Sequence, residues 1–371
     1  GNEMVLVKAK RDELLTPLIA VSGIVERRHT LPILSNVLLE RSANGLSFLA
    51  TDIELQITSR ALLDHAGDAY AVTVGARKLV EILRALPDGT DVTLQQQDKR
   101  MLVKAGKSRF SLQTLPAEDF PRLSKPTGEV AHFVVAQKAM RRLLGLVQYA
   151  MAQQDIRYYL NGLLMLVEDK QLKLVATDGH RLAFASMKLE ADLPRQEVIV
   201  PRKTVLELSK LLADTEEELQ VAISATQAAF SFGSIELISK LVDGKFPDYT
   251  RVIPTQHRNT LRLNRDVLRQ ALLRAAILSN EKFRGVRWIL SDGSLKIGSS
   301  NAEQEEAQEE LEVTYSGDAL DIGFNVNYLL DVLNNVPGES VDCSFGDSSS
   351  SALVTYASEQ NFKYVVMPMR I

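Results

Sequence analysis

The stretch YAVTVGARKLVEILRALPDG, which runs from Tyr70 to Gly89, decides the fold because the chain contains three copies of it. A second copy, EVIVPRKTVLELSKLLAD, occupies residues 197–214, and a third, LDIGFNVNYLLDVLNNVPG, occupies residues 320–338. Arg77 of the first copy matches Arg202 of the second at an offset of 125 residues. Repetition at a fixed spacing indicates a repeated structural unit.

Further blocks repeat in the same order around this stretch. ILSNVLLE followed by LATDIELQI is echoed by YLNGLLML followed by VATDGHRLA, and FSLQTLPAEDFPRL aligns without gaps with ELISKLVDGKFPDY. The third copies, FRGVRWIL, LKIGSSNAEQEEA and the terminal KYVVMPMRI, are weaker. Polar junctions that contain proline separate the copies, so we predict three domains, at residues 1–127, 128–255 and 256–371. We expect Gly1–Glu3, ahead of Met4, to be an expression remnant outside the first domain.

Each repeat combines helical and strand patterns. Within residues 138–150, apolar side chains such as Met140 and Val147 recur at helical spacing, with basic residues on the opposite side. VTVGA, LKLVAT and LEVTY have the length and the β-branched content of strands. We expect Asn264 and Asp12 to be the N-caps of the first helices of domains three and one. The predicted fold class is α+β, with two helices packed on an antiparallel sheet in each domain.

The composition is that of a globular chain with several cores: 371 residues, of which 45% are hydrophobic and 24% charged. The single cysteine, Cys343, excludes an intramolecular disulfide and a CxxC zinc site, and indicates a reducing cytoplasm. The chain lacks both an apolar run near the ~20 residues that span a bilayer and a signal-like start. We therefore expect a cytoplasmic protein that does not enter a membrane. A net charge of −4 argues against binding nucleic acid through overall charge.

Charge is nevertheless distributed unevenly along the chain. Acidic residues gather in TEEE at residues 215–218 and in EQEEAQEE at residues 303–310. Basic residues gather on the predicted helices: Arg77, Lys78, Arg84, Lys138, Arg141, Arg142, Arg265 and Arg269. One interpretation is that these are the solvated faces of ordinary helices. The other is that three helix pairs turn to one side and together attract phosphate without reading base sequence.

The segment TDGHR at residues 177–181 looks catalytic, because it places a carboxylate, an imidazole and a guanidinium together. The first repeat keeps TD at residues 51–52 but continues without a histidine. We therefore interpret the shared aspartate as a turn residue that holds its own backbone. The five histidines are scattered, and no metal-binding or phosphate-binding motif occurs. We expect no catalytic residue, no metal site and no cofactor.

Several strings resemble the bacterial replicative sliding clamps, the beta subunits of DNA polymerase III: HTLPILSN, RYYLNG, VATDGHRLA, VIVPRK, SKLVDGKFPDY, AILSNEKFRGVR and YVVMPMRI. The resemblance is collinear from Met4 to Ile371. It implies a non-catalytic processivity factor, in which two three-domain chains join head to tail as a ring of six similar domains around duplex DNA.

The resemblance also implies three sets of functional residues. A pocket between domains two and three, expected to bind short motifs that carry a glutamine and apolar residues, comprises Leu160, Thr177, Gly179, His180, Arg181, Leu182, Pro247, Arg251, Val252, Asn325, Val365, Met367, Pro368, Met369 and Arg370. The residues expected to contact DNA are Arg28, Gln154, Tyr158, Tyr159, Arg202 and Lys203. The dimer interface is expected to join Lys78, Arg100, Lys107, Arg109 and Phe110 to Ile277, Leu278, Glu303, Glu305 and Glu306.

The implied partners are double-stranded DNA bound without sequence preference and a second copy of the chain. The resemblance adds the DNA polymerase III alpha subunit, the clamp loader, and other polymerases and repair proteins that carry clamp-binding motifs. Two alternatives remain: a three-domain peptide-binding scaffold that does not encircle DNA, and a hydrolase centred on Asp178, His180 and Arg181.

Overall fold

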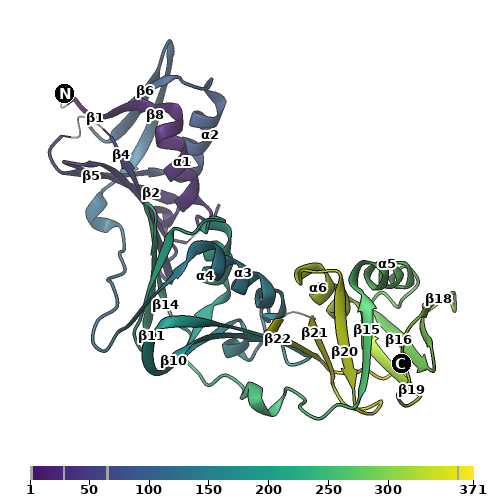
Figure 1. Ribbon diagram of the computed structural model, residues 1–371. Coiled ribbons are helices and arrows are strands. Elements are labelled where there is room, and N and C mark those ends of the chain that lie inside the picture. Colours follow the sequence, from purple (N-terminus) through teal and green to yellow (C-terminus); the bar gives the residue numbers. More distant parts are fainter. Residues whose placement is uncertain (1–2, 28–29, 64–66, 357–358) are drawn as a thin grey trace. The chain divides into compact units, whose positions relative to one another are not determined.

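The computed structural model describes residues 3–27, 30–63, 67–356 and 359–371 (Figure 1). It divides into two compact units, residues 1–140 with 206–241 and residues 141–205 with 242–371. These units cut across the repeat, because a strand of one repeat continues the sheet of the repeat before it. Strand β14 of the second repeat pairs with β4 of the first, and β22 of the third pairs with β11 of the second.

The first unit contains one antiparallel sheet of 12 strands, in the order β1-β6-β7-β8-β5-β2-β3-β4-β14-β13-β12-β9. Its strands are β1 Glu3–Lys10, β2 Asn36–Ser42, β3 Gly45–Thr51, β4 Leu55–Leu62, β5 Tyr70–Gly75, β6 Asp91–Gln97, β7 Arg100–Ala105, β8 Ser108–Leu115, β9 Ala131–Ala136, β12 Glu218–Ile223, β13 Gln227–Phe232 and β14 Ile235–Lys240. Its helices are α1 Arg11–Ser22 and α2 Ala76–Ala85, with short 3-10 turns η1 Pro32–Ser35 and η2 Ala117–Asp119. Because β1 begins at Glu3, the first strand includes a residue that we had expected to lie outside the domain.

The second unit contains a six-stranded sheet in the order β10-β11-β22-β21-β20-β15 and a four-stranded sheet in the order β18-β17-β16-β19. Its strands are β10 Gly162–Thr177, β11 Arg181–Pro201, β15 Asn259–Asn264, β16 Gly285–Ser291, β17 Ser294–Ser300, β18 Glu306–Glu312, β19 Leu320–Asn325, β20 Ser340–Phe345, β21 Ala352–Tyr356 and β22 Glu359–Val366. Its helices are α5 Arg265–Ala276 and α6 Val326–Asn335, with 3-10 turns η3 Gln148–Ala150, η4 Tyr158–Leu160 and η5 Tyr249–Arg251.

Two helices link the units in sequence: α3 Gln137–Val147 and α4 Arg202–Leu211. Helix α3 follows the predicted periodicity, because Met140 and Val147 are completely buried. It ends earlier than predicted, since residues 148–150 form the separate turn η3. Together with α1, α2, α5 and α6, these helices confirm the prediction of two helices per repeat.

The paired helices pack on their sheets through apolar faces. Helix α1 contacts α2 and the strands β3 and β4, and α5 contacts α6 and β17; Figure 1 shows each pair side by side. Leu14 and Leu18 of α1 and Leu79 and Leu83 of α2 are fully buried. At ~25 cal/mol per Å² of apolar surface, such burial is the main stabilising contribution to each layer.

The two expected N-caps have different outcomes. Asn264 caps α5, because its side-chain oxygen accepts a hydrogen bond from the Val267 amide at 2.9 Å. The expectation for Asp12 is wrong, because α1 begins at Arg11 and Lys10 occupies the cap position. The Lys10 amide donates instead to Glu13 Oε1 at 2.9 Å, and the helix begins at Arg11, two residues earlier than a cap at Asp12 would place it.

This difference predicts unequal effects of two matched substitutions. Asn264→Ala should lower the free energy of opening the first turn of α5 by about 1 kcal/mol, because the Val267 amide loses its acceptor. Asp12→Ala should change the corresponding value for α1 by less than about 0.5 kcal/mol. Hydrogen exchange of the amides in the first turn of each helix measures both opening free energies. Equal decreases in the opening free energy of α1 and α5 would contradict this account of the caps.

The strand predictions also differ in outcome. VTVGA lies largely in β5 and LKLVAT in β10, as predicted. For LEVTY the prediction is wrong beyond Glu312, because β18 occupies the acidic run before it. Glu306, Glu310 and Glu312 are exposed while Ala307, Glu309 and Leu311 are half-buried on the other face, which is the pattern of a half-exposed strand. The residues after it belong to no strand, and the Val313 amide donates to the carbonyl of Gly293 at 3.1 Å.

Candidate functional site

A cavity of about 170 Å³ lies in the second unit, between the loop at residues 157–160, the turn at 177–182, the segment at 247–252 and the end of β22. It is lined by Arg157, Tyr159, Leu160, Thr177, Gly179, His180, Arg181, Leu182, Pro247, Val252, Val365 and Met367. The structure therefore brings most of the predicted pocket residues together, although they come from segments far apart in the sequence.

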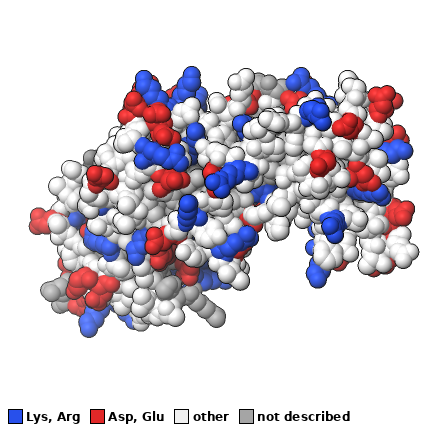
Figure 2. Space-filling view, turned by 90° about the horizontal axis from the view of Figure 1, so that it is seen from below, with Lys and Arg blue, Asp and Glu red and all other residues white. Residues whose placement is uncertain are grey.

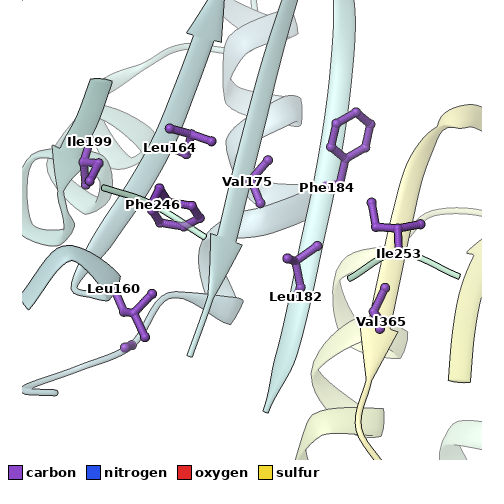
Figure 3. Close-up of a cluster of buried hydrophobic side chains, with 10 residues drawn as sticks. Leu160, Leu164, Val175, Leu182, Phe184, Ile199, Phe246, Ile253 and Val365 are labelled. Atoms are coloured by element: carbon purple, nitrogen blue, oxygen red, sulfur yellow. The ribbon is translucent and has the colours of Figure 1, made fainter. Parts of the chain in front are cut away.

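The floor of this cavity is apolar and firmly packed. Leu182 of β11 pairs with Val365 of β22, and both belong to a buried cluster with Leu160 and Phe246 (Figure 3). Leu160, Leu182 and Val365 are 1%, 2% and 1% exposed, so they form a rigid base. Met367 is 50% exposed at the rim, where a flexible thioether can adapt to an apolar guest.

The turn that forms one wall is held by its own threonine and aspartate. Asp178 Oδ1 accepts from the amides of His180 at 2.9 Å and Arg181 at 3.1 Å, and Thr177 Oγ1 donates to the carbonyl of Arg181 at 2.7 Å. The first repeat makes the same turn: Asp52 Oδ1 accepts from the amides of residues 54 and 55 at 3.0 and 2.7 Å. This confirms the interpretation of the shared aspartate as a turn residue.

The turn needs a left-handed backbone at its third position. Gly179 has φ +89° there, and Ile53 has φ 81° at the matching position of the first repeat. A Cβ at Gly179 would also lie 2.9 Å from a guanidinium nitrogen of Arg157. Glycine therefore lets the Arg157 side chain approach the turn closely at the rim of the cavity.

Arg181 is the buried charge of the cavity wall, with its side chain 8% exposed. Its Nε donates to Asp178 Oδ2 at 2.9 Å, and its Nη1 donates to Asp331 Oδ2 at 2.9 Å. Its guanidinium carbon lies 4.6 Å from the centre of the Tyr328 ring. Burial alone would lower the pKa of Arg181, but Tyr364, Asp331 and Asp178 outweigh it and raise that pKa above its ordinary value. The arginine is therefore a permanently charged group that the wall itself neutralises.

The remaining predicted pocket residues lie outside this cavity. Pro368, Met369 and Arg370 line a second hollow of about 610 Å³ with Arg287, Asp321, Gly323, Ser348, Ser349 and Ile371. Asn325 caps α6 and accepts from the Asn327 amide at 2.9 Å. Arg251 is largely exposed and pairs with Asp248 at 3.6 Å.

Sequence reasoning missed one lining residue and assigned another elsewhere. Arg157 was not predicted, although it lines the cavity and pairs with Asp155 at 3.0 Å. Tyr159 was expected to contact DNA, but its half-buried side chain packs against the cluster under the cavity. The only available signal was position: both residues stand in QQDIRYY, directly before Leu160.

Most of the residues predicted to contact DNA form one group on the second unit. Gln154 lies on the loop that follows η3, and Tyr158, which begins η4 at the end of that loop, is 57% exposed. Arg202, at the start of α4, donates to the carbonyl of Met151 in the same loop at 3.4 Å, and Lys203 is half-buried next to it. The prediction for Arg28 falls outside the residues that the structure describes.

Several basic residues on the helices are engaged within the fold. Lys138 pairs with Glu216 at 2.5 Å, Arg142 with Glu359 at 2.8 Å and Arg269 with Asp266 at 2.9 Å. Arg265 donates to the carbonyls of Leu333 and Gly338, each at 2.8 Å, so it joins α5 to the end of α6.

The other basic side chains are available to a partner. In the described part of the chain, Arg77, Lys78, Arg84 and Arg141 are exposed and form no ion pair. Figure 2 shows basic and acidic side chains intermixed on the face it presents. An attraction for phosphate therefore depends on a subset of the predicted cations.

Six of the residues predicted to form the dimer interface lie on or beside two strands with an open edge, whereas Lys78 is on α2, Arg100 begins β7, and Ile277 and Leu278 follow α5. The segment 108–113 of β8 pairs only with β7, and β18 pairs only with β17. Lys107 and Arg109 are exposed on or beside β8, while Glu303 and Glu305 precede β18 and Glu306 begins it. Ile277 is 77% exposed after α5, and Phe110 is half-buried on β8. Part of the acidic group therefore lies on a strand, β18.

A search of the described ranges finds no group of three or more histidine, cysteine, aspartate or glutamate side chains that could hold a metal ion. Among the helices of those ranges, none combines the length and apolar character needed to cross a membrane.

Comparisons with known proteins agree along the whole chain. Family models of the DNA polymerase III beta subunit match at residues 6–124 for the N-terminal domain, 134–248 for the central domain and 250–370 for the C-terminal domain. The beta sliding clamp of Salmonella typhimurium is 49% identical over 362 residues, covering 98% of this chain and 99% of the relative. That of Pseudomonas aeruginosa is 48% identical over 365 residues, with the same coverage.

Solved structures agree as well. The crystal structure of the Pseudomonas aeruginosa sliding clamp bound to griselimycin has a TM-score of 0.95 at 48% identity, covering 99% of this chain and all of that one. The beta sliding clamp of Caulobacter crescentus, with polyethylene glycol at a region proposed for β-motif tethering, has a TM-score of 0.93 at 40% identity and covers 100% of both chains.

Proposed function

This chain belongs to the family of DNA polymerase III beta subunits, the beta sliding clamps, and from that premise we propose how its residues act. Its function is that of a sliding clamp in DNA replication, a non-catalytic processivity factor whose partners are DNA and a polymerase. The observation that carries the residue-level proposal is the apolar cavity beside the turn at residues 177–182. We place peptide binding there, the dimer interface on β8 and β18, and DNA contacts on the loop after η3.

The ring follows from the way that the repeats join. Within the chain, β14 extends the sheet that ends in β4, and β22 extends the sheet that contains β11. The matching pair at the third junction is β8 of the first repeat and β18 of the third: residues 108–113 of β8 pair only with β7, and β18 pairs only with β17, so each has an open edge. Pairing β18 with β8 of a second copy, twice, closes two chains head to tail. Arg109 and Lys107 then face an acidic strand, which favours this pairing over others.

The cavity suits a short peptide segment with apolar side chains. Leu160, Leu182 and Val365 supply a preformed apolar floor, and Met367 supplies an adaptable rim. The two arginines of the wall are already paired with carboxylates of the protein, so a guest gains little from carrying acidic groups into the cavity. A motif with apolar residues and a neutral glutamine fits this lining. The polymerase alpha subunit, the clamp loader, other polymerases and repair proteins would carry such motifs and compete for one site.

Contacts to DNA are diffuse and independent of base sequence. The exposed Tyr158 and Gln154, with Arg202 and Lys203 behind them and Arg28 on the first repeat, can meet the sugar-phosphate backbone. Arg77, Lys78, Arg84 and Arg141 add exposed charge on the helices, which are expected to face the duplex. Individually such contacts are weak and screened by salt, so they allow the ring to move along the duplex.

The setting of these activities is the cytoplasm. Cys343 is 3% exposed and free, and burial raises the pKa of its thiol to about 12. The thiol is therefore protonated and inert at neutral pH, as a buried structural cysteine is.

The hydrolase alternative is not supported by the geometry. Both oxygens of Asp178 accept hydrogen bonds from the turn or from Arg181, and the ring of His180 stacks on Tyr328 with centroids 6.2 Å apart. An aspartate engaged in this way does not orient the imidazole as a general base.

Replacing His180 by alanine tests the position of the peptide site. We expect about a tenfold loss of affinity for a labelled peptide of one glutamine followed by apolar residues, because the cavity loses one wall. Fluorescence anisotropy measures the affinity, and native mass and circular dichroism should match the unsubstituted chain. His132→Ala, an exposed change on β9, is the matched control. Unchanged affinity for His180→Ala would show that the peptide binds elsewhere.

A further inference from the structure

Asp331 is a charged residue of α6 that does not line the cavity but holds one of its walls. Its carboxylate accepts from Arg181 Nη1 at 2.9 Å, and its side chain is 39% exposed. Arg181 itself lines the cavity and is 8% exposed. Among the described residues, the side-chain contact that connects Asp331 to the cavity lining is the one with Arg181.

The contact between Arg181 and Asp331 is one of several that join α6 to the turn of the second repeat. The hydroxyl of Tyr364 donates to the carbonyl of Tyr328 at 2.7 Å and lies 3.3 Å from Arg181 Nη1, from which it accepts. Burial raises the pKa of Tyr364, so this hydroxyl stays protonated and can donate. The ring of Tyr328 lies under the guanidinium at 4.6 Å and stacks on His180 at an interplanar angle of 16°.

Arg181 contacts a second carboxylate, that of Asp178, and this contact determines the effect of removing Asp331. Asp178 Oδ2 also accepts from Arg181, at 2.9 Å, so the guanidinium keeps one ionic partner if Asp331 is lost. A buried arginine left with no ionic partner would strongly destabilise the fold, whereas Arg181 retains Asp178 as a partner when Asp331 is lost. Loss of Asp331 therefore removes the ionic contact between the arginine and α6, while the contact with Asp178 in the turn remains.

We propose that Asp331 is a positioning residue for the peptide site: it fixes the Arg181 side chain against α6, and so sets the shape and the neutrality of the wall that a peptide meets. This inference rests on the proposed peptide site. It adds to that site a residue of α6 that contacts the lining residue Arg181 but does not itself line the cavity. Fixing the arginine before binding spares a peptide the cost of ordering it.

A double-mutant cycle tests the inference. Asp331→Asn should weaken binding of the glutamine-and-apolar peptide about fivefold to tenfold, measured by fluorescence anisotropy. In an Arg181→Met background the same change should alter affinity less than about twofold, because the group through which Asp331 acts is gone. Asp342→Asn, which removes the same charge from a pair with the exposed Arg262 in the same unit, is the control and should leave affinity unchanged.

A purely structural role for Asp331 gives a different result. It would weaken binding equally in both backgrounds, together with faster hydrogen exchange throughout α6, and that outcome overturns the inference. Peptide binding that is normal in Asp331→Asn also overturns it, while leaving the proposed site intact. If the unsubstituted chain fails to bind the peptide at all, both the site and the inference fail.

Discussion

Replacing Leu278 by aspartate is expected to convert dimers into monomers that keep their secondary structure. Leu278 is half-buried directly after α5, next to Ile277, which is 77% exposed. In the proposed ring these two side chains and Phe110 form the apolar centre of the contact between β18 and β8. A carboxylate placed there would have to be desolvated without an ionic partner, which costs several kcal/mol at each of two identical interfaces.

Native mass at micromolar concentration measures this effect directly. A loss of about 3 kcal/mol at each of the two interfaces, or about 6 kcal/mol per ring, weakens dimerisation by roughly 10,000-fold, and a dilution series shows this as a shift from dimer to monomer. Leu62→Asp is the matched control, because Leu62 is 85% exposed and lies outside the proposed interface. A Leu278→Asp protein that remains dimeric would show that the interface is elsewhere, even if the chain still binds peptides.

The repeat made most of the fold predictable from the sequence. Comparing copies identified two helices per unit, the strands β5 and β10 and the turn role of Asp178, because each copy served as a control for the others. The errors arose where the local sequence was compatible with more than one structure. Asp12 is a good N-cap residue, but Glu13 accepts the amide of Lys10 and α1 begins earlier. The strand predicted at LEVTY lies earlier in the chain, because the acidic run that precedes it forms the edge strand β18 with alternating exposure.

The candidate site depended more on family resemblance than on residue chemistry. Nothing in the sequence alone indicates that Leu160, Leu182 and Val365 meet, since they come from η4, β11 and β22 and are joined only by tertiary packing. Arg157 was missed because an arginine in a polar loop has no pattern that distinguishes it from solvated charge. Arg265 was taken for a surface cation, although it satisfies carbonyls at the end of α6. Assigning this role to Arg265 requires coordinates, because the carbonyls that it contacts lie about 70 residues further along the chain.

The measurement that tests the central claim most directly compares retention on circular and linear DNA. The clamp is loaded by its clamp loader and ATP onto a nicked circular plasmid, and bound protein is followed by gel filtration. The ring is proposed to hold DNA by enclosing it, and its individual contacts to the duplex are weak. The protein can therefore slide off a free DNA end without breaking a strong contact. We predict stable retention on the circle and near-complete loss within minutes of a single restriction cut. Equal retention on the circular and linear forms would contradict encirclement.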